Sequence, residues 1–416
     1  MEGAADFGSA RGQRALLPEA QTPKVRCATM RPGVPVGRAL INQEEYMFNR
    51  KGRFGVATLA CVGLAFAIST PAYAWERGKV ENFLLPSGSP MVEGLTVGPD
   101  GLIYAATFNP TGSPPSQLIT FNSDGSVKKQ VNITGSSQAM LGLEVIPGTT
   151  NALLVLDFGA GQVLAVDPTK DNDNASVCIT LPPGNNPGNK GTRSGLNGIT
   201  FDKAGNVYFS DSFQGIIWRF SPTESGSMCG QATAWVGPDP TLLPNNGKPP
   251  EGVPPFGANG VEFNNAGDAM FVCNTAMDWI VKIPTTGGKH GTPGTPVVFT
   301  NSLNGCDGLR LDSSDNIWVA ANQADEIVVV STTDPTSGQV IAKLGDFNGV
   351  QNGETQGLLF PASPAFSPDG KTLWVTNLEL DLTTIGITQS VDSKWAAQVK
   401  THSIAKLPVP ATFPAF

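Results

Sequence analysis

Residues 259–274 decide the fold, and they read NGVEFNNAGDAMFVCN. A polar residue and a glycine open the stretch, and alternating apolar and polar residues follow. A turn rich in Asn, Gly and Asp then leads into a second apolar run. Alternation with a period of two around such a turn is typical of a β-hairpin. Five further stretches repeat this pattern, and they start at Glu93, Leu141, Asn197, Asp307 and Ala362.

The spacing of these repeats predicts a β-propeller. The second residue of each repeat is a glycine at positions 94, 142, 198, 260 and 308, and a serine at position 363, so the repeats are 48 to 62 residues apart. Repeats of about this length with several strands each are typical of propeller blades. We therefore expect an all-β, six-bladed β-propeller over residues 75–416, with four strands in each blade. Residues 79–85 are expected to pair with the last blade near residues 401–407 and to close the ring.

The segment before the repeats resembles an export signal. Residues 47–53 are basic, residues 54–70 are apolar and small, and residues 72–74 read Ala-Tyr-Ala. These features predict a secretory signal peptide over residues 47–74, a mature start near Trp75, and a secreted or periplasmic protein. A transmembrane anchor is disfavoured because the apolar run is short and ends in a cleavage site. We expect Met47 to be the true start and residues 1–46 to be an over-extended reading of the gene, with a genuine N-terminal extension as the alternative.

The charge of the predicted mature chain excludes nucleic acid as a partner. The whole sequence has a formal net charge of −8, but residues 1–74 hold 9 basic and 5 acidic side chains, so residues 75–416 have a net charge of −12. An acidic surface without a basic patch repels phosphates. We expect a monomer that binds a small molecule, without membrane association once the signal is removed.

The first residues of the six repeats form a column that predicts a metal site. In a propeller, the start of each innermost strand faces the central channel, so Glu93, Asn197, Asn259 and Asp307 would converge there. Carboxylate and amide oxygens suit Ca²⁺ first, with Mg²⁺ or Mn²⁺ as alternatives. Zn²⁺ also accepts carboxylates, although no His or Cys stands in the column. The alternative is that Asn and Asp precede glycine only as turn residues, but four such residues at one register favour a metal.

The remaining two column positions and three long loops predict an open site. Leu141 and Ala362 cannot bind a cation, and they leave room for the open coordination position that a catalytic metal needs. Loops rich in Pro, Gly and Asn, at residues 182–194, 237–258 and 345–361, precede three of the column residues. Such insertions fall on one face of a propeller, which is usually the binding face. The alternative is that they are tolerated surface loops.

The strand starts Glu-Gly, Asn-Gly, Asn-Gly and Asp-Gly resemble the senescence marker protein/gluconolactonase family, which includes regucalcin-type lactonases and the related diisopropyl fluorophosphatase. The resemblance covers residues 75–416. It implies that Glu93, Asn259 and Asp307 bind a divalent cation and that Asn197 contacts the substrate or completes the metal shell. It also implies that Asp307 acts as the base or the nucleophile.

Two departures from this family concern its sugar-lactone specificity. Sugar-lactonase members have an Arg two residues before the first Asn, where this chain has Gly195. Arg193 lies close by and is the substrate-binding candidate. The first Asn is often followed by Asp in the family, where this chain has Gly198. The metal site therefore transfers better than the sugar-lactone specificity.

The predicted function is that of an exported, divalent-cation-dependent carboxylic ester hydrolase of the lactonase type. Asp307, or a water bound to the metal, would attack the carbonyl. One alternative is a non-catalytic propeller that binds a ligand or partner, with a structural cation. Another is a propeller lyase or a strictosidine-synthase-like enzyme, since fold does not fix function. The loops before the column are mostly apolar, which predicts a neutral, apolar lactone or ester as the substrate.

Other residues carry little catalytic signal. Only His290 and His402 are present, and both lie outside the repeat cores, which disfavours a catalytic triad. Asp211 and Asn274 end second strands and are interpreted as capping residues first and substrate contacts second. No glycine-rich phosphate loop follows a strand and opens a helix.

Four cysteines remain in the predicted mature chain, and an even number in an exported protein favours disulfides. Cys178 and Cys229 lie in the outer strands of neighbouring blades and form the better pair. Cys273 and Cys306 lie in inner strands of adjacent blades. For them, a disulfide and free buried thiols both remain open.

Overall fold

The structure is a computed structural model that describes residues 77–182, 194–244, 254–286, 291–388 and 390–413. The predicted signal peptide and residues 1–46 lie outside the described residues. Within the described ranges, no helix has the length and apolar character that a membrane span needs.

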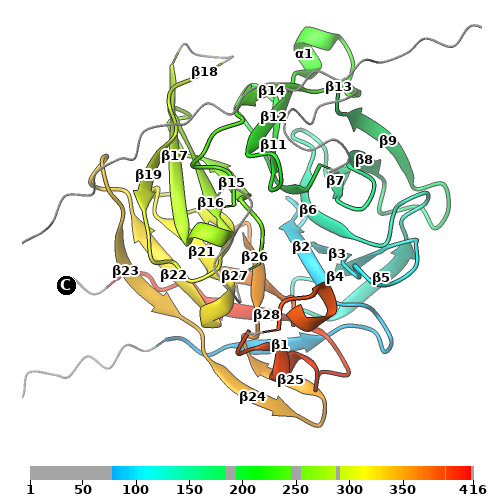
Figure 1. The fold of residues 1–416 in the computed structure, drawn as a ribbon. Coiled ribbons are helices and arrows are strands. Elements are labelled where there is room, and N and C mark those ends of the chain that lie inside the picture. The colour runs from blue at the N-terminus through cyan, green and yellow to red at the C-terminus, as the bar shows by residue number, and fades with distance from the viewer. Residues whose placement is uncertain (1–76, 183–193, 245–253, 287–290, 389, 414–416) are drawn as a thin grey trace, which may run out of the picture. The chain divides into compact units, whose positions relative to one another are not determined.

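The described residues form six antiparallel sheets that follow one another around a central axis (Figure 1). This confirms the predicted all-β, six-bladed propeller. From the centre outward, the strands of blade 1 are β2 (Val92–Val97), β3 (Ile103–Thr107), β4 (Gln117–Phe121) and β5 (Val127–Asn132). Those of blade 2 are β6 (Met140–Val145), β7 (Leu153–Asp157), β8 (Gln162–Val166) and β9 (Ala175–Thr180). Those of blade 3 are β10 (Leu196–Phe201), β11 (Val207–Asp211), β12 (Ile216–Phe220) and β14 (Thr233–Val236).

The second half of the ring repeats this arrangement. Blade 4 has β15 (Ala258–Phe263), β16 (Ala269–Asn274), β17 (Trp279–Thr286) and β19 (Val297–Thr300), with β18 (Thr292–Pro293) also paired to β17. Blade 5 has β20 (Cys306–Leu311), β21 (Ile317–Ala321), β22 (Glu326–Ser331) and β23 (Gln339–Leu344). Blade 6 has β26 (Pro361–Phe366), β27 (Thr372–Asn377), β28 (Ser403–Pro408) and β1 (Glu81–Leu84).

The ring closes as the sequence predicts. The N-terminal strand β1 pairs antiparallel with β28, with Glu81 opposite Lys406 and Leu84 opposite Ser403. The first described strand thus becomes the outer strand of the last blade. Because both ends of the propeller share one sheet, opening the ring would break this hydrogen-bond ladder and expose sheet edges.

Short elements connect the blades. A hairpin of β24 (Phe347–Gln351) and β25 (Glu354–Gly357) occupies the segment between blades 5 and 6 that the sequence predicts to be a loop. The two strands are joined by a tight turn at Asn352 and Gly353, which both have positive φ angles. The helical turns are α1 (Pro222–Ser225), η2 (Thr275–Met277), η4 (Asn322–Ala324), η5 (Leu382–Ile385) and α2 (Ser393–Ala396).

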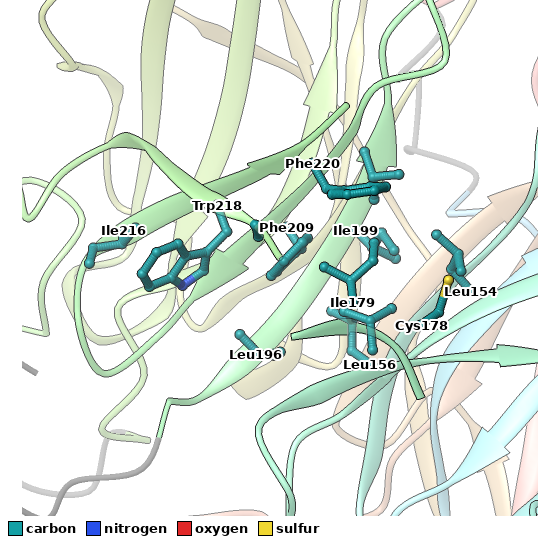
Figure 2. Close-up of a cluster of buried hydrophobic side chains, with 13 residues drawn as sticks. Leu154, Leu156, Cys178, Ile179, Leu196, Ile199, Phe209, Ile216, Trp218 and Phe220 are labelled. Carbon is teal, nitrogen blue, oxygen red and sulfur yellow. The ribbon is translucent and has the colours of Figure 1, made fainter. Parts of the chain in front are cut away.

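The hydrophobic core consists of layers between neighbouring blades. Second strands such as β7 (LLVLD) and β21 (IWVAA) are buried along their whole length because each blade packs on both faces. Outer strands such as β5 (VKKQVN) are largely exposed and accordingly polar. Figure 2 shows the layer between blades 2 and 3, where Trp218 and Phe220 from β12 lie in one cluster with Leu154 from β7.

A disulfide connects the outer edges of these two blades. Cys178 in β9 is bonded to Cys229, as the sequence predicts. The next two residues form β13 (Gly230–Gln231), which leaves blade 3 and pairs parallel with β9 of blade 2. The bond and the added strand thus hold a blade 3 connection against blade 2.

Candidate metal centre and active site

The column residues lie at β-bulges near the start of the inner strands. In blade 4, the pairing between β15 and β16 shifts between Ala258 and Val261. Asn259 and Gly260 therefore face a single residue, Cys273. The other five inner strands shift at the corresponding place. Bulges re-aim side chains and often occur next to active sites.

The glycine of each bulge is required by a close approach between blades. A Cβ atom on Gly260 would lie 2.6 Å from the carbonyl oxygen of Asp307, and one on Gly198 would lie 2.5 Å from that of Asn259. Real Cβ atoms do not approach a backbone oxygen so closely. The column glycines therefore let neighbouring inner strands meet backbone to backbone around the channel.

Hydroxyl groups opposite two bulges bond to the next blade. Ser210 Oγ donates a hydrogen bond of 2.6 Å to the carbonyl oxygen of Asn259. Thr376 Oγ1 donates one of 2.6 Å to the carbonyl oxygen of Glu93. Both donors are buried, and they fix the backbone of a column residue from the preceding blade.

A disulfide occupies the same place in blade 4. Cys273, opposite the bulge, is bonded to Cys306 of blade 5, which directly precedes Asp307. The sequence left the state of these two cysteines open. Their disulfide anchors the Asp307 backbone to the preceding blade, as the hydroxyls of Ser210 and Thr376 anchor other column residues.

Side-chain hydrogen bonds fix the orientation of the two column amides. Asn197 Nδ2 donates to Ser212 Oγ at 3.1 Å, and Asn259 Nδ2 donates to Thr275 Oγ1 at 2.8 Å. Because both amide nitrogens donate hydrogen bonds within the protein, the amide oxygens are the atoms available to bind a cation. Amide oxygens are suitable ligands for hard cations.

Asp307 and Glu93 share a buried environment. Burial raises the pKa of Asp307 to about 7, against hydrogen bonds from Asn322 and Asn259 that lower it. Burial and the nearby Asp307 carboxylate raise the pKa of Glu93 well above its usual range. Glu93 Oε2 is buried and has no hydrogen-bond partner among the described residues. Two carboxyl groups thus lie close together without a cationic side chain on the cavity they share.

The residues present fit a divalent cation. The donor set consists of two carboxylates and two amides, with an unpartnered carboxylate oxygen, and a bound cation would compensate the buried negative charge. Within the described residues, no three His, Cys, Asp or Glu side chains cluster in an arrangement that could hold a metal ion. Any cation site at the column therefore needs the amides of Asn197 and Asn259 as well as the carboxylates.

A small cavity lies above the column and has an apolar roof. Its volume is about 30 Å³, enough for an ion or water molecules but far below that of a substrate. Its polar lining residues are Glu93, Asn197, Asn259, Asp307 and Asn322. Its apolar lining residues, here called the roof, are Phe108, Leu141, Pro254, Phe256, Phe360, Leu378 and Leu380.

The roof is part of a larger apolar cluster. Phe108, Leu141, Phe360 and Leu378 pack in one group of buried side chains. Phe158 extends this group, because its ring centroid lies 6.2 Å from that of Phe108 and 6.2 Å from that of Phe256. The polar lining residues, here called the floor, are thus the polar column residues and Asn322.

A second polar layer closes the channel three residues further along the inner strands. Arg310 makes ion pairs with Glu144 of blade 2 and Glu262 of blade 4. Thr96 and Thr200 donate 2.8 Å hydrogen bonds to these two carboxylates. The three charged side chains are only 17% to 20% exposed. A cavity of about 30 Å³ separates this layer from the column, and it is lined by Glu93 on one side and Arg310 on the other.

The structure brings together the four predicted metal ligands, while other predictions have different outcomes. Arg193 lies outside the described residues. Asp211 accepts hydrogen bonds from the backbone amides of Gly195, Phe213 and Gln214, which confirms it as a capping residue. Asn274 likewise donates to the carbonyl groups of residues 241 and 243.

His402 and its partner Glu379 lie in blade 6. His402 precedes β28, and its Nδ1 lies 2.6 Å from Oε2 of the buried Glu379. Glu379 stands between the roof residues Leu378 and Leu380 in the segment that follows β27. The pair thus anchors the base of a roof segment, and the cavity lining does not include it.

Sequence analysis missed several residues of the site. Asn322 stands 15 residues after Asp307, as Ser212 does after Asn197, so aligning the repeats at this offset would have found it. Aligning the positions three residues after the column would likewise have placed Glu144, Glu262 and Arg310 in one layer. Leu378 directly follows β27 as Asn322 follows β21, so aligning the repeats by their second strands would have found it, whereas Leu380 lies in a longer connection without a counterpart in the other repeats.

Comparisons with known proteins agree with this architecture. A family model described as the SMP-30/Gluconolactonase/LRE-like region matches residues 256–379, which include Asn259, Asp307 and Asn322. A search of curated proteins finds no match.

Solved structures are similar in fold at low sequence identity. A luciferin-regenerating enzyme is 12% identical with a TM-score of 0.57, and the alignment covers 82% of this chain and 97% of that one. Regucalcin from Agrobacterium tumefaciens is 16% identical with a TM-score of 0.52, over 82% and 98% of the two chains. A gluconolactonase from Xanthomonas campestris is 13% identical with a TM-score of 0.50, over 82% and 93%. At these identities the likeness concerns the fold alone. The chain is a six-bladed propeller, and its residues 256–379 match the SMP-30/Gluconolactonase/LRE-like family model, which supports the resemblance found in the sequence.

Proposed function

We propose that this protein is an exported, divalent-cation-dependent hydrolase of a neutral, apolar lactone or ester. The observation that carries the proposal is the unpartnered, buried Glu93 oxygen among the oxygen donors of a cavity with apolar walls. The family model matched over residues 256–379 and the solved gluconolactonase and regucalcin of the same fold support a lactonase-type activity.

In this proposal, Glu93, Asn197, Asn259 and Asp307 hold the cation, with Ca²⁺ as the preferred ion. When bound, the cation supplies Lewis acidity that polarises the substrate carbonyl and stabilises the developing oxyanion. Ser212 and Thr275 keep the amide oxygens of Asn197 and Asn259 directed to the channel. Mg²⁺, Mn²⁺ and Zn²⁺ remain alternatives that a binding assay distinguishes.

Asp307 is the proposed general base. Its Oδ2 accepts a hydrogen bond from Asn322, which holds the carboxylate in place on the cavity to take the proton of the attacking water. The water oxygen forms a bond to the carbonyl carbon, and the bond to the alcohol oxygen breaks. The proton on Asp307 then passes to the departing alkoxide, so that the carboxylate is restored and an acid and an alcohol are formed.

The roof supports an apolar substrate. A hydroxyl group buried against Phe256, Phe360 or Leu380 would have no partner there, which costs about 1–3 kcal/mol. The reacting carbonyl would face the polar floor, and an alkyl or aryl group would face the roof. Because the cavity has a volume of only about 30 Å³, roof side chains must move for a substrate to enter.

Turnover measured on a panel of lactones and aryl esters tests this function. With saturating Ca²⁺, kcat/KM for an alkyl- or aryl-substituted lactone is expected to exceed that for glucono-1,5-lactone at least about tenfold, ~1.4 kcal/mol of discrimination. Removing the cation with a chelator is expected to abolish turnover, and adding Ca²⁺ back to restore it. Chelator-resistant turnover would contradict the mechanism, and a preference for gluconolactone would contradict the substrate class. Cation binding without any turnover would favour the non-catalytic alternative.

Export is proposed on the signal-like sequence of residues 47–74. Expression from Met47 is expected to give an exported protein whose N-terminus, determined by sequencing, lies near Trp75. A retained product with an uncleaved N-terminus would contradict export.

A further inference from the structure

Asn322 is a buried polar residue of the cavity that lies outside the column. It begins η4 directly after β21, and its side chain is 2% exposed. Its Nδ2 donates a hydrogen bond of 2.9 Å to Asp307 Oδ2. One side of its amide thus fixes one oxygen of the proposed base.

The other side of the amide is unpartnered. Asn322 Oδ1 is buried and has no hydrogen-bond partner among the described residues. The chain also makes room for this atom, because a Cβ on Gly305 would lie 1.9 Å from it. Leaving a buried acceptor unpaired costs about 1–3 kcal/mol. Since Asn322 lines a cavity large enough for a water molecule, a water is the simplest donor that could reach the oxygen.

The corresponding residues of the two preceding blades differ in this respect. Ser212 Oγ accepts from Asn197 and donates at 2.6 Å to the carbonyl oxygen of Ala258. Thr275 Oγ1 accepts from Asn259 and donates at 2.7 Å to that of Cys306. Each hydroxyl is therefore used by protein atoms on both sides. Asn322 contacts its column residue in the same way, but its Oδ1 has no hydrogen-bond partner among the described residues.

We propose that Asn322 is a positioning residue for the hydrolytic water. Its Nδ2 holds the Asp307 carboxylate in place, and its Oδ1 accepts a hydrogen bond from the water that attacks the substrate. The role in hydrolysis rests on the proposed function, whereas the bound water can be tested without turnover.

Two measurements on Asn322→Leu and Asn322→Ala test the proposal. Leu has a similar size but no hydrogen-bonding atoms, and Ala provides a variant without steric demand if the first does not fold. We expect kcat to fall about 10- to 100-fold, as for other residues that orient a catalytic group, while the Kd for Ca²⁺ and KM change less than about threefold. A purely structural residue would not produce this separation of kcat from Ca²⁺ affinity.

Ser212→Ala and Thr275→Ala serve as matched controls, because they remove the corresponding supports of Asn197 and Asn259. Both are expected to weaken Ca²⁺ binding measured by calorimetry, with kcat recovering at saturating Ca²⁺. If the Asn322 variants kept kcat within about threefold of the wild type, or regained it at high Ca²⁺, the positioning role would be wrong.

A crystal structure of the wild-type protein with Ca²⁺ gives a readout that does not depend on activity. We expect an ordered water within hydrogen-bond distance of Asn322 Oδ1, and we expect it to be absent in Asn322→Leu. A wild-type structure without this water would overturn the proposal even if lactones are hydrolysed. Its presence in a protein without turnover would support the water site while contradicting the proposed function.

Discussion

At the scale of single residues, the site is defined by negative charge that the protein itself does not neutralise. Glu93 and Asp307 are the only charged residues that line the cavity among those described, and both are buried. Their pKa values are raised in the folded protein, that of Asp307 to about 7. Such a pair is costly when ionised, and this cost is the physical basis for expecting a cation.

This pair predicts a pH-dependent stability of the cation-free protein. Unfolded Asp and Glu have pKa values of about 3.9 and 4.3, so the folded state binds more protons than the unfolded chain between about pH 4 and pH 7. Stability should therefore fall as pH rises through this window, with the full penalty present above the raised pKa values. Ca²⁺ competes with these protons, and it should raise Tm more at pH 8 than at pH 5.5.

Thermal denaturation followed by circular dichroism, with chelator and with Ca²⁺, checks this dependence. Glu93→Gln is the control, because it removes one of the two titrating groups and should flatten the pH dependence of Tm in chelator. An equal Ca²⁺-induced rise in Tm at both pH values would show that the pair does not bind the cation.

At the scale of elements, three of the four proposed metal ligands are held by a contact from the preceding blade. The Cys273–Cys306 disulfide takes the place of the hydroxyl contacts made by Ser210 and Thr376. Ser210 lies opposite the bulge of blade 3, as Cys273 lies opposite that of blade 4, and it donates to the carbonyl oxygen of Asn259. Ala258 directly precedes Asn259, as Cys306 directly precedes Asp307. Ser in place of Cys273 and Ala in place of Cys306 would therefore reproduce the arrangement of Ser210 and Ala258.

We predict that Cys273→Ser/Cys306→Ala retains more Ca²⁺ affinity than Cys273→Ala/Cys306→Ala. The serine can donate to the Asp307 carbonyl oxygen as Ser210 does to that of Asn259, and such a buried hydrogen bond contributes about 1 kcal/mol. Calorimetry with Ca²⁺ and urea denaturation of both variants provide the test. Equal affinities and stabilities would mean that the contact opposite the bulge does not position Asp307.

Some elements of the fold could be predicted from the sequence and others could not. The column and the inner strands could be predicted because an alternating strand recurs in every blade, preceded by a glycine in five blades and by Ser363 in the sixth. The hairpin of β24 and β25 was predicted as a loop, since the segment has no repeat partner. Leu380 was missed for the same reason. The contact of Asn322 with Asp307 depends on how two strands pair, so a search of single motifs could not find it.

At the scale of the whole molecule, two features hold the ring closed. The β1–β28 ladder joins its ends, and Arg310 joins blade 5 to blades 2 and 4 across the channel. Glu144 and Arg310 are 166 residues apart in sequence, so their pairing follows only from the closed ring. The Arg310 layer also closes the channel on the side away from the roof, which leaves the roof as the route to the site.

We predict that Arg310→Met destabilises the protein by about 2–4 kcal/mol, because it leaves two largely buried carboxylates without a cation. The triple variant Arg310→Met/Glu144→Gln/Glu262→Gln should recover most of this loss, since no unpaired charge remains. Urea denaturation measures both. If the single variant were as stable as the wild type, the ion-pair layer would not hold the ring together.

The central claim is that the column binds one divalent cation, and calorimetric titration of the purified protein with Ca²⁺ tests it most directly. We predict one site per chain in the wild type. Glu93→Gln and Asp307→Asn should each weaken binding by at least the ~10–100-fold that loss of an outer-shell partner causes. Asp268→Asn, which alters an exposed carboxylate in a turn of blade 4, should leave binding unchanged. Absence of binding to the wild type, or equal affinity in all four proteins, would contradict the account.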